Sequence, residues 1–552
     1  MLSPGYLETL PDPVVELIRE MEDKILAQMA IRITKYGWTE QSQWEADRLE
    51  AMGVIRSDIT RILSQYTGMT EDAIREIVTD AGRESVRQDQ QLYEAAGVWS
   101  DKAIDRDAMN QIMTAGLNRT QRTFRNLTGT LAKETAKAFT RAMDSAWLAA
   151  ATGTIDPKTA GRRAIKELCA KGIQTVRYPS GHTDHVEVAV RRALVTGINQ
   201  SALAVQDELL DELGGDLVET TAHSGARPEH ALWQGKVFSR FGRTPGYPTL
   251  AAGTGYGTVT GLGGANCRHS YSPFFPGYEP AYSDDILKEY QRKTCTYNGK
   301  ELTEYEASQQ QRYFERGIRR WKREYVAMEA AGEDTTQASV KLKQWREREA
   351  DFLRQTDRRR DSSRSQIGTF GRSEAGKATW QAQEYYNVWS KSIGVKESIK
   401  TLAKYYDVKY NDSPRYELLQ QYAKDVKSGW VSPLSGFANY EALHNRVESE
   451  LVGRKTSNGI QISGQAKHFI QRIIGTGADP IKTDATGKPV RRSGVEFDAI
   501  ADALFNGAVR PVKTDPKTNK RSQKFHNDAC EVSVNPDTGT LIQCNPKRKR
   551  SE

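Results

Sequence analysis

The sequence predicts a multidomain chain that is mainly α-helical in its N-terminal and central regions. A small Gly- and aromatic-rich α+β module lies between these regions, and a small α+β domain is expected at the C-terminus. Apolar residues recur at helical spacing over long stretches, and this pattern changes in two places. With 552 residues, the chain is long enough for about three or four domains of ~150 residues. The charged fraction of 27% and the mean hydropathy of −0.67 indicate a polar, helix-rich protein.

Several classes of protein are disfavoured by what the sequence lacks. It has no run of about 18 apolar residues, and its start, MLSPGYLETLPDP, does not resemble a signal peptide, so we expect a protein made and kept in a cytoplasm. It has no GxxxxGK[ST] phosphate-binding loop, which disfavours a motor ATPase. The cysteines are odd in number and lack a CxxC pair, which disfavours a disulfide framework and a zinc ribbon: Cys169, Cys267, Cys295, Cys530 and Cys544.

Positive charge is concentrated near the C-terminus. Residues 451–552 contain 18 Lys and Arg against 10 Asp and Glu, a difference of +8 that equals the net charge of the whole chain. A localised positive field is the usual means of binding a polyanion such as nucleic acid. A solvated surface with a basic tail, KRKR at 547–550, is the alternative, and composition leaves both open.

Residues 1–213 are expected to be helical. Asp12 and Pro13 predict a helix start, because an N-cap and a first-turn proline precede apolar residues at helical spacing. Thr70, followed by Glu71 and Asp72, predicts another helix start for the same reason. The favoured interpretation of this region is a helical scaffold without chemistry of its own.

The composition changes in residues 214–285, where Gly, His and aromatic residues cluster and helical periodicity ends. We expect a compact β-containing or loop-rich module with glycines at positive φ. Residues 286–360 return to a charged helical pattern interrupted by AAGEDTT, which predicts an antiparallel helical hairpin with solvated, ion-paired faces. Residues 361–456 are interpreted as a hinge and a helical linker in which aromatic residues at helical spacing, Tyr385, Tyr386 and Trp389, form core.

Residues 457–552 have their own order of elements. A short helix is expected over Ala466 to Ile474, followed by a loop and by an amphipathic helix, VEFDAIADALFNG, that ends at Gly507. Two alternating runs then flank Asn535-Pro536-Asp537-Thr538-Gly539, which is typical of a β-hairpin. A small α+β domain is the result.

The blocks TAHSGARPEHALWQGKVFS and GGANCRHSYSPFFPG, with the helical region before them, resemble the phage minor capsid protein 2 family, which is akin to the Mu F-like minor head proteins. The resemblance implies a structural virion protein present in few copies, located in the capsid interior or near the portal. It implies partners in the portal protein, the major capsid protein and phage DNA, and a role in head assembly, genome packaging or delivery. The region 1–213 would dock on portal or capsid subunits, and no catalysis is implied.

The same two blocks contain His223, His230, Cys267 and His269, residue types that bind metals. Because their spacing is uneven, the favoured interpretation is a polar network that ties the loops of the module together, without a metal or other cofactor. The expected members of that network are His223, Arg227, His230, Asn266 and Arg268.

The C-terminal segments KHFIQR, SGVEFDAIADALFNGAVRPVK and VSVNPDTGTLIQCNP resemble phage-borne nucleases grouped with barnase, EndoU, colicin E5/D and RelE. The resemblance implies metal-independent RNA cleavage, in which a base activates the ribose 2′-OH and cations stabilise the phosphate charge. Host RNA is then a further partner. Such a site needs a histidine or similar base, one or more cations and an exposed groove.

His468 and Arg472 lie four residues apart on an expected helix, so they share a face, and His468 is the expected base. Lys524 and His526 would add a cation and a second acid or base. Further residues expected to contact nucleic acid are Lys467, Lys513, Gln543, Lys547 and Arg548.

Gln543 occupies a position on the final strand where related domains often have a hydroxyl residue, which counts against activity. Three hypotheses therefore remain: a head protein with a nuclease, a head protein whose tail binds the genome without catalysis, and an assembly factor with an incidental basic tail.

Overall fold

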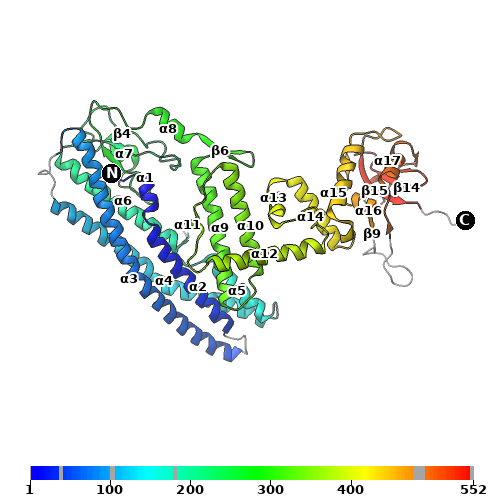
Figure 1. Cartoon of the computed structure of the whole chain (residues 1–552), viewed down its shortest axis with the longest axis horizontal. Helices are drawn as coiled ribbons and strands as arrows, with labels where there is room; N and C mark the ends of the chain where they lie inside the picture. Colours follow the sequence, from blue (N-terminus) through cyan, green and yellow to red (C-terminus); the bar gives the residue numbers. More distant parts are fainter. Residues whose placement is uncertain are drawn as a thin grey trace. The chain divides into compact units, whose positions relative to one another are not determined.

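The computed structural model describes residues 2–35, 41–99, 106–177, 183–476, 492–516 and 518–547. The chain divides into two compact units, Met1–Thr379 and Trp380–Glu552 (Figure 1). The five-segment division expected from composition is finer than these two units and stays a prediction. Within the described residues, no helix combines the length and apolar character needed to cross a membrane.

The N-terminal region is helical, as predicted, and α2 begins at Asp12. Between the last two helices of this region, β1 (Gln174–Arg177) and β2 (Thr183–His185) form an antiparallel pair. The helices are α1 (Pro4–Thr9), α2 (Asp12–Lys35), α3 (Gln41–Ala95), α4 (Arg106–Ala151), α5 (Pro157–Lys171) and α6 (Val186–Glu212).

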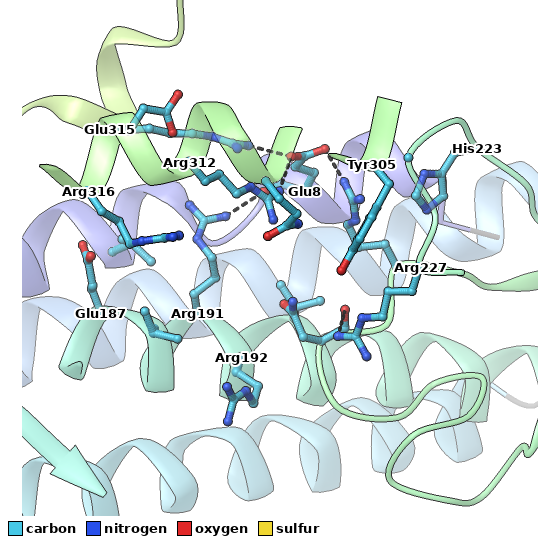
Figure 2. A pocket seen from close by; sticks show the side chains of 18 of the residues that line it. Glu8, Glu187, Arg191, Arg192, His223, Arg227, Tyr305, Arg312, Glu315 and Arg316 are labelled. Atoms are coloured by element: carbon cyan, nitrogen blue, oxygen red, sulfur yellow. Dashed lines mark hydrogen bonds and ion pairs between the residues drawn. The ribbon is translucent and has the colours of Figure 1, made fainter. Parts of the chain in front are cut away.

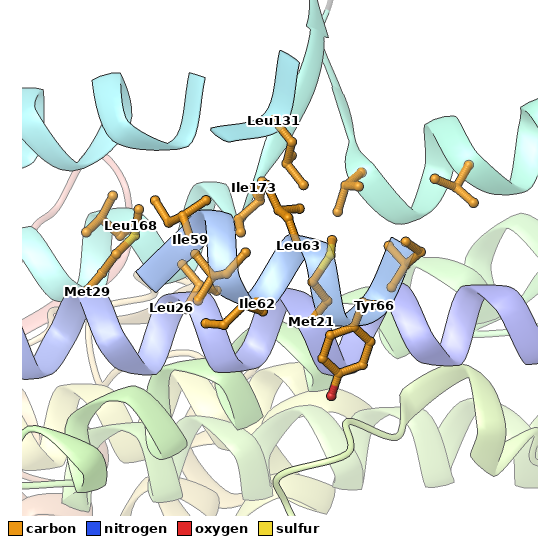
Figure 3. Close-up of a cluster of buried hydrophobic side chains, with 14 of the residues drawn as sticks. Met21, Leu26, Met29, Ile59, Ile62, Leu63, Tyr66, Leu131, Leu168 and Ile173 are labelled. Carbon is orange, nitrogen blue, oxygen red and sulfur yellow. The ribbon is translucent and has the colours of Figure 1, made fainter. Parts of the chain in front are cut away.

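The core of this region lies where α2, α3, α4 and α5 meet (Figure 3). The apolar residues of α2 recur three or four positions apart, which places them on one buried face. The residues labelled in the figure are Met21, Leu26 and Met29 of α2, Ile59, Ile62, Leu63 and Tyr66 of α3, Leu131 of α4, Leu168 of α5, and Ile173.

The helix start predicted at Thr70 is wrong, because Thr70 lies inside α3. Its hydroxyl donates a hydrogen bond of 2.8 Å to the carbonyl of Tyr66, one turn earlier in the same helix. A threonine can satisfy its hydroxyl in this way at any interior helical position, so a threonine before acidic residues does not by itself mark an N-cap.

The module that follows is β-containing, as predicted. Its three-stranded antiparallel sheet has the order β4 (Val237–Ser239), β3 (Leu217–Thr220), β5 (Tyr271–Pro273), and α7 (Leu250–Thr254) lies between β4 and β5 in the sequence. Positive φ also occurs at glycines as expected. Gly235 has a φ of 67°, and an added Cβ would lie 2.7 Å from Leu287.

The predicted helical hairpin is present as α9 (Glu304–Ala330) and α10 (Thr336–Thr356), which pack along each other. The expectation of solvated charged faces is wrong for α9, which also packs on α2 and α5. Its buried charged residues are Glu315, Arg319, Lys322, Arg323 and Glu324. In the sequence, α8 (Asp284–Gln291), β6 (Lys293–Tyr297) and β7 (Lys300–Thr303) precede the hairpin, and α11 (Ser362–Ser365) and α12 (Arg372–Ser392) follow it.

In the second unit, a helical part precedes a small mixed sheet. The helical part contains α13 (Leu402–Asn411), α14 (Ser413–Lys427), the 3₁₀ helix η1 (Pro433–Ser435), α15 (Phe437–Arg446) and the π-helical turn η2 (Val447–Leu451). Of the aromatics predicted to form core, Tyr386 is buried, Trp389 is partly buried, and Tyr385 is 53% exposed, so the prediction is wrong for Tyr385.

The sheet has the order β11 (Ala508–Val509), β13 (Arg521–His526), β14 (Cys530–Val534), β15 (Thr540–Pro546), β8 (Gly464–Gln465), and β12 (Lys513–Thr514) pairs with β13. β15 and β8 are parallel, whereas the other pairs are antiparallel. The predicted hairpin is confirmed as β14 and β15.

The two helices of this domain flank the pair β9 (Gly475–Thr476) and β10 (Arg492–Ser493) in the sequence. The second predicted helix is present as α17 (Phe497–Phe505). The first predicted helix, Ala466 to Ile474, is present as the shorter α16 (Phe469–Ile474).

Candidate functional site

Two segments of the Gly-rich module bring imidazole and thiol groups together. The first leaves β3 and turns at Arg227, whose carbonyl accepts a hydrogen bond of 2.9 Å from the backbone N–H of His230. The second approaches β5 through Cys267 and His269. Asn199 of α6 holds this segment in place, because its side-chain amide donates to the carbonyls of Cys267 (3.1 Å) and His269 (2.9 Å).

His230, Cys267 and His269 form what we call the His–Cys cluster. Sγ of Cys267 lies 3.9 Å from Nδ1 of His230 and 3.7 Å from Nδ1 of His269, and the three residues are at most 3% exposed. Nε2 of His230 lies 2.9 Å from the carbonyl of Thr260, and Nε2 of His269 lies 3.1 Å from Oε1 of Gln234. Because these oxygens accept, each Nε2 carries the proton and each Nδ1 keeps its lone pair toward the thiol.

The ring of His223 stacks against that of His269, but His223 does not contact Sγ of Cys267 as the two histidines of the cluster do. Its ring centroid lies 4.7 Å from that of His269, and its Nδ1 donates to the carbonyl of Ser224 at 2.8 Å. Its backbone N–H donates to Oε1 of Gln234 at 3.1 Å, which sets the orientation of that amide.

Burial keeps the imidazoles of this region neutral. Burial, reinforced by the Arg268 guanidinium, lowers the pKa of His223 to about 4. Burial also lowers the pKa of His230, and together with the neighbouring imidazoles it lowers that of His269 well below its ordinary value. Burial raises the pKa of the Cys267 thiol. Neutral imidazoles are the form that ligates metals, and the donor atoms of the cluster lie within 4.8 Å of one another.

The remaining residues of the predicted polar network contact different segments. Arg227 donates to the carbonyl of Ala265 at 3.0 Å, which links the two segments of the module. Asn266 has a φ of 56° at the turn before Cys267. Arg268 leaves the module and pairs with Glu8 near the start of the chain.

Glu8 is the centre of a cavity of about 370 Å³ that we call the arginine cavity (Figure 2). Its carboxylate pairs with Arg268, with Arg312 at 3.2 Å and with Arg364 at 2.6 Å. Burial opposes the ionised carboxylate, but these guanidinium groups outweigh burial and lower the pKa of Glu8 to about 2. The N-terminal segment, the module, α9 and α11 are thereby tied to one carboxylate.

Glu187 of α6, which lines the same cavity, also joins distant segments through ion pairs. It pairs with Arg19 of α2 at 2.7 Å and with Arg319 of α9, and each of the three side chains is less than 10% exposed. Burial opposes its ionisation, yet the Arg319 and Arg19 guanidinium groups hold the pKa of Glu187 well below its usual range. The chemistry of this cavity is therefore internal ion pairing.

In the C-terminal unit, His468 and Arg472 are close but do not share a helix. His468 is the N-cap of α16, just before the first helical residue, whereas Arg472 lies within the helix. Both border the helical part of the unit: Arg472 lies over the ring of Trp430 at 5.4 Å, and Asp425 contributes to the electrostatic surroundings of His468. Burial and the Arg472 charge lower the pKa of His468.

Lys524 and His526 flank the buried Phe525 on β13, so they project from the face of the sheet opposite to that of Phe525. Nζ of Lys524 donates to Oε1 of Glu531 at 2.5 Å, and Nζ of Lys547 donates to Nδ1 of His526 at 3.1 Å. Arg510 also reaches Glu531, at 3.4 Å. We call Arg510, Lys524, His526, Glu531 and Lys547 the sheet-face group. In the part of the chain that the structure describes, no hydrogen bond or ion pair joins this group to His468 or Arg472.

The other predicted nucleic-acid contacts are distributed. Lys467 and Lys513 are exposed, on the loop before α16 and on β12. Gln543 lies on β15 opposite Ser533. Arg548 lies outside the described residues.

Sequence reasoning missed Glu531 and Glu8. The register of the predicted hairpin could have indicated Glu531, because it pairs with His526 across the strands. No local signal could have indicated Glu8, since its partners are 260 to 356 residues away in the chain.

Comparison with known proteins finds relatives of this chain. A family model described as phage minor capsid protein 2 matches residues 2–354. A structural protein of Lactococcus phage LL-H is 24% identical over 330 residues, covering 54% of this chain and 81% of that protein. A structural protein of Lactococcus phage mv4 is 35% identical over 94 residues, covering 17% of this chain and 68% of that protein. No solved structure matches.

Proposed function

The chain belongs to the phage minor capsid protein 2 family, and we propose that it is a minor head protein near the portal that carries a metal-independent ribonuclease domain at its C-terminus. The family supports a structural role in the virion, with phage head proteins as partners. The location near the portal, the contribution to head assembly, packaging or delivery, and the nuclease are our proposals.

The first unit is suited to a docking role. Its helices are long, α3 having 55 residues and α4 having 46, and distant segments are joined by ion pairs in the arginine cavity. Such a body keeps a fixed shape while its outer helical faces contact portal or capsid subunits.

The sheet-face group is the observation that supports a nuclease. A histidine, a carboxylate and three cations lie together on one side of a sheet, in a domain that carries net positive charge. These are the groups that cleavage of RNA without a metal requires. His468 and Arg472 form a second candidate pair on α16.

A mechanism follows from the hydrogen bonds of the group. Glu531 accepts the proton of a ribose 2′-OH, and that oxygen attacks the adjacent phosphorus. The bond from phosphorus to the 5′-oxygen breaks as His526 donates its Nε2 proton to that oxygen. The Lys547 ammonium, which donates to Nδ1, passes a proton to that nitrogen in the same step, so the imidazole stays neutral. Lys524 and Arg510, now paired with Glu531, lie close enough to stabilise the phosphate charge. The products are a 2′,3′-cyclic phosphate and a 5′-hydroxyl.

The test incubates the full chain with total tRNA, and separately with single-stranded DNA, in the presence of EDTA. We expect cleavage of RNA only, and a fall in rate of about 10²–10⁴-fold in Glu531→Gln and His526→Ala, the usual size of acid–base contributions. His468→Ala distinguishes the two candidate sites, and Asp537→Asn, a carboxylate change at the hairpin turn, is the matched control.

Binding of RNA and DNA without cleavage of either would overturn the proposed ribonuclease activity. It would favour a C-terminal domain that binds the phage genome without catalysis. One observation favours this second function: Gln543 stands on β15 where related domains often have a hydroxyl residue.

A further inference from the structure

We propose that the His–Cys cluster of His230, Cys267 and His269 is a zinc site that fastens the two segments of the Gly-rich module to each other. This site goes beyond the proposed function, because neither docking nor RNA cleavage requires it.

The first argument is donor geometry. Tetrahedral zinc with bonds of about 2.3 Å to sulfur and about 2.0–2.1 Å to nitrogen places those ligand atoms about 3.6 Å apart. Sγ of Cys267 lies 3.7 Å and 3.9 Å from the two Nδ1 atoms. All donor atoms lie within 4.8 Å of one another, so binding requires the two rings to move inward.

The second argument is the set of groups behind the ligands. A zinc-bound histidine usually donates its other ring N–H to a carbonyl or carboxylate oxygen, which fixes the tautomer and the ring orientation. Both histidines have this arrangement, to the carbonyl of Thr260 and to Oε1 of Gln234. Gln234 is itself fixed by the backbone N–H of His223.

The third argument concerns the surrounding charge. Two arginines lie near the cluster, and both bond to groups outside it. Arg268 pairs with Glu8, and Arg227 donates to the carbonyls of Ala265 and Asn266. A thiolate at Cys267 would reduce the charge of a bound divalent ion to +1. The thiol proton is released on binding, as in other zinc–thiolate sites.

The arginine cavity supplies the fourth position. Its lining includes His230 and His269 but not Cys267, so the cavity borders the imidazole side of the cluster. A water molecule from this side would complete the tetrahedron. His223 does not provide the fourth ligand, because its Nδ1 is bonded to Ser224 and its ring stacks on that of His269.

The test uses the untagged full chain, reduced, stripped with a chelator and titrated with Co²⁺ and then Zn²⁺. We expect one equivalent of Co²⁺ to give visible bands and a near-ultraviolet sulfur-to-cobalt band, and Zn²⁺ to remove both. Cys267→Ser loses the near-ultraviolet band, whereas Cys295→Ser, the matched control at a cysteine outside the module, keeps it.

Gln234→Ala tests the positioning of His269. It should weaken zinc binding by about 10–100-fold while keeping the sulfur-to-cobalt band, as changes behind zinc ligands do. Bound zinc should also raise the midpoint of thermal unfolding of the parent protein and of Cys295→Ser. Failure of the parent chain to bind an equivalent of Co²⁺ or Zn²⁺, or an unchanged cobalt spectrum in Cys267→Ser, would overturn the site.

Discussion

The arginine cavity of the first unit and the sheet-face group of the second are both rich in cations, yet they differ in how those cations are balanced. In the cavity, Glu8 and Glu187 each accept ion pairs from two or three guanidinium groups, and the Glu187 pairs are nearly inaccessible to solvent. On the sheet face, one carboxylate, Glu531, lies among cations that are partly exposed.

A count of arginines and lysines therefore does not distinguish structure from function. Guanidinium groups can be buried when a carboxylate satisfies their planar donors, which suits a role in folding. Lysines at a surface stay hydrated and available to a phosphate.

The largest effect is expected at Glu187. Replacing Glu187 with Ala leaves Arg19 and Arg319 buried without their carboxylate, which should lower the free energy of unfolding by about 3–5 kcal/mol. Chemical denaturation of the full chain, followed by circular dichroism, measures the change. A decrease in the free energy of unfolding below about 1 kcal/mol would mean that the arginine cavity tolerates loss of a carboxylate as well as an exposed surface does. The two regions would then not differ in how their charges are balanced.

Acid should destabilise the first unit in two steps. His223 has a folded pKa of about 4 against 6.5 in the unfolded chain, so the unfolded state binds more protons and stability falls as the pH drops from 6.5 to 4. Glu8 has a folded pKa of about 2 against 4.5, so its contribution is present above pH 4.5 and is lost as the pH falls toward 2. Each group changes stability by at most about 1.4 kcal/mol per pH unit.

The measurement is the midpoint of thermal unfolding, determined at a series of pH values from 7 to 3. His223→Asn should reduce the upper step, to which the lowered pKa values of His230 and His269 also contribute, and Glu8→Gln should reduce the lower step. Identical profiles in the parent and both variants would contradict the assignment.

Nucleic-acid binding should depend on the second unit alone. Lys513→Ala and Lys547→Ala should each reduce the slope of log affinity against log salt by about 1, because each removes one phosphate contact. Arg316→Ala, a change at an exposed arginine that lines the arginine cavity, should leave the slope unchanged. Fluorescence anisotropy over a salt series provides the measurement, and an equal change in all three variants would remove the distinction between the two regions.

The smallest effect is expected for an exposed ion pair. Lys293 and Glu301 lie 3.9 Å apart with side chains 58% and 69% exposed. Glu301→Ala should change the free energy of unfolding by no more than about 0.5 kcal/mol, because solvent screens such pairs. Measured beside Glu187→Ala, it gives the scale for a solvated charge in the same unit.

Local patterns predicted much of the fold. The start of α2 at Asp12, the hairpin of α9 and α10, and the strands β14 and β15 follow from caps, periodicity and turn residues, which act over a few neighbouring positions. The same local rules failed at Thr70, where a hydroxyl bonded within its own helix imitates a cap. For the predicted sites, the sequence indicated which residue types could act, but it did not indicate which side chains contact them in space.

The amino-acid pattern was enough to predict the helical character of the first unit, the change of composition at the module, the net charge of the C-terminal domain and the family resemblance. The packing of the chain was needed to show which charges are buried, that Glu8 pairs with Arg268 and Arg364, and that His230, Cys267 and His269 face one another. Periodicity and capping depend on interactions within a few residues, whereas ion pairs and ligand sets depend on segments hundreds of residues apart, whose packing no local pattern encodes.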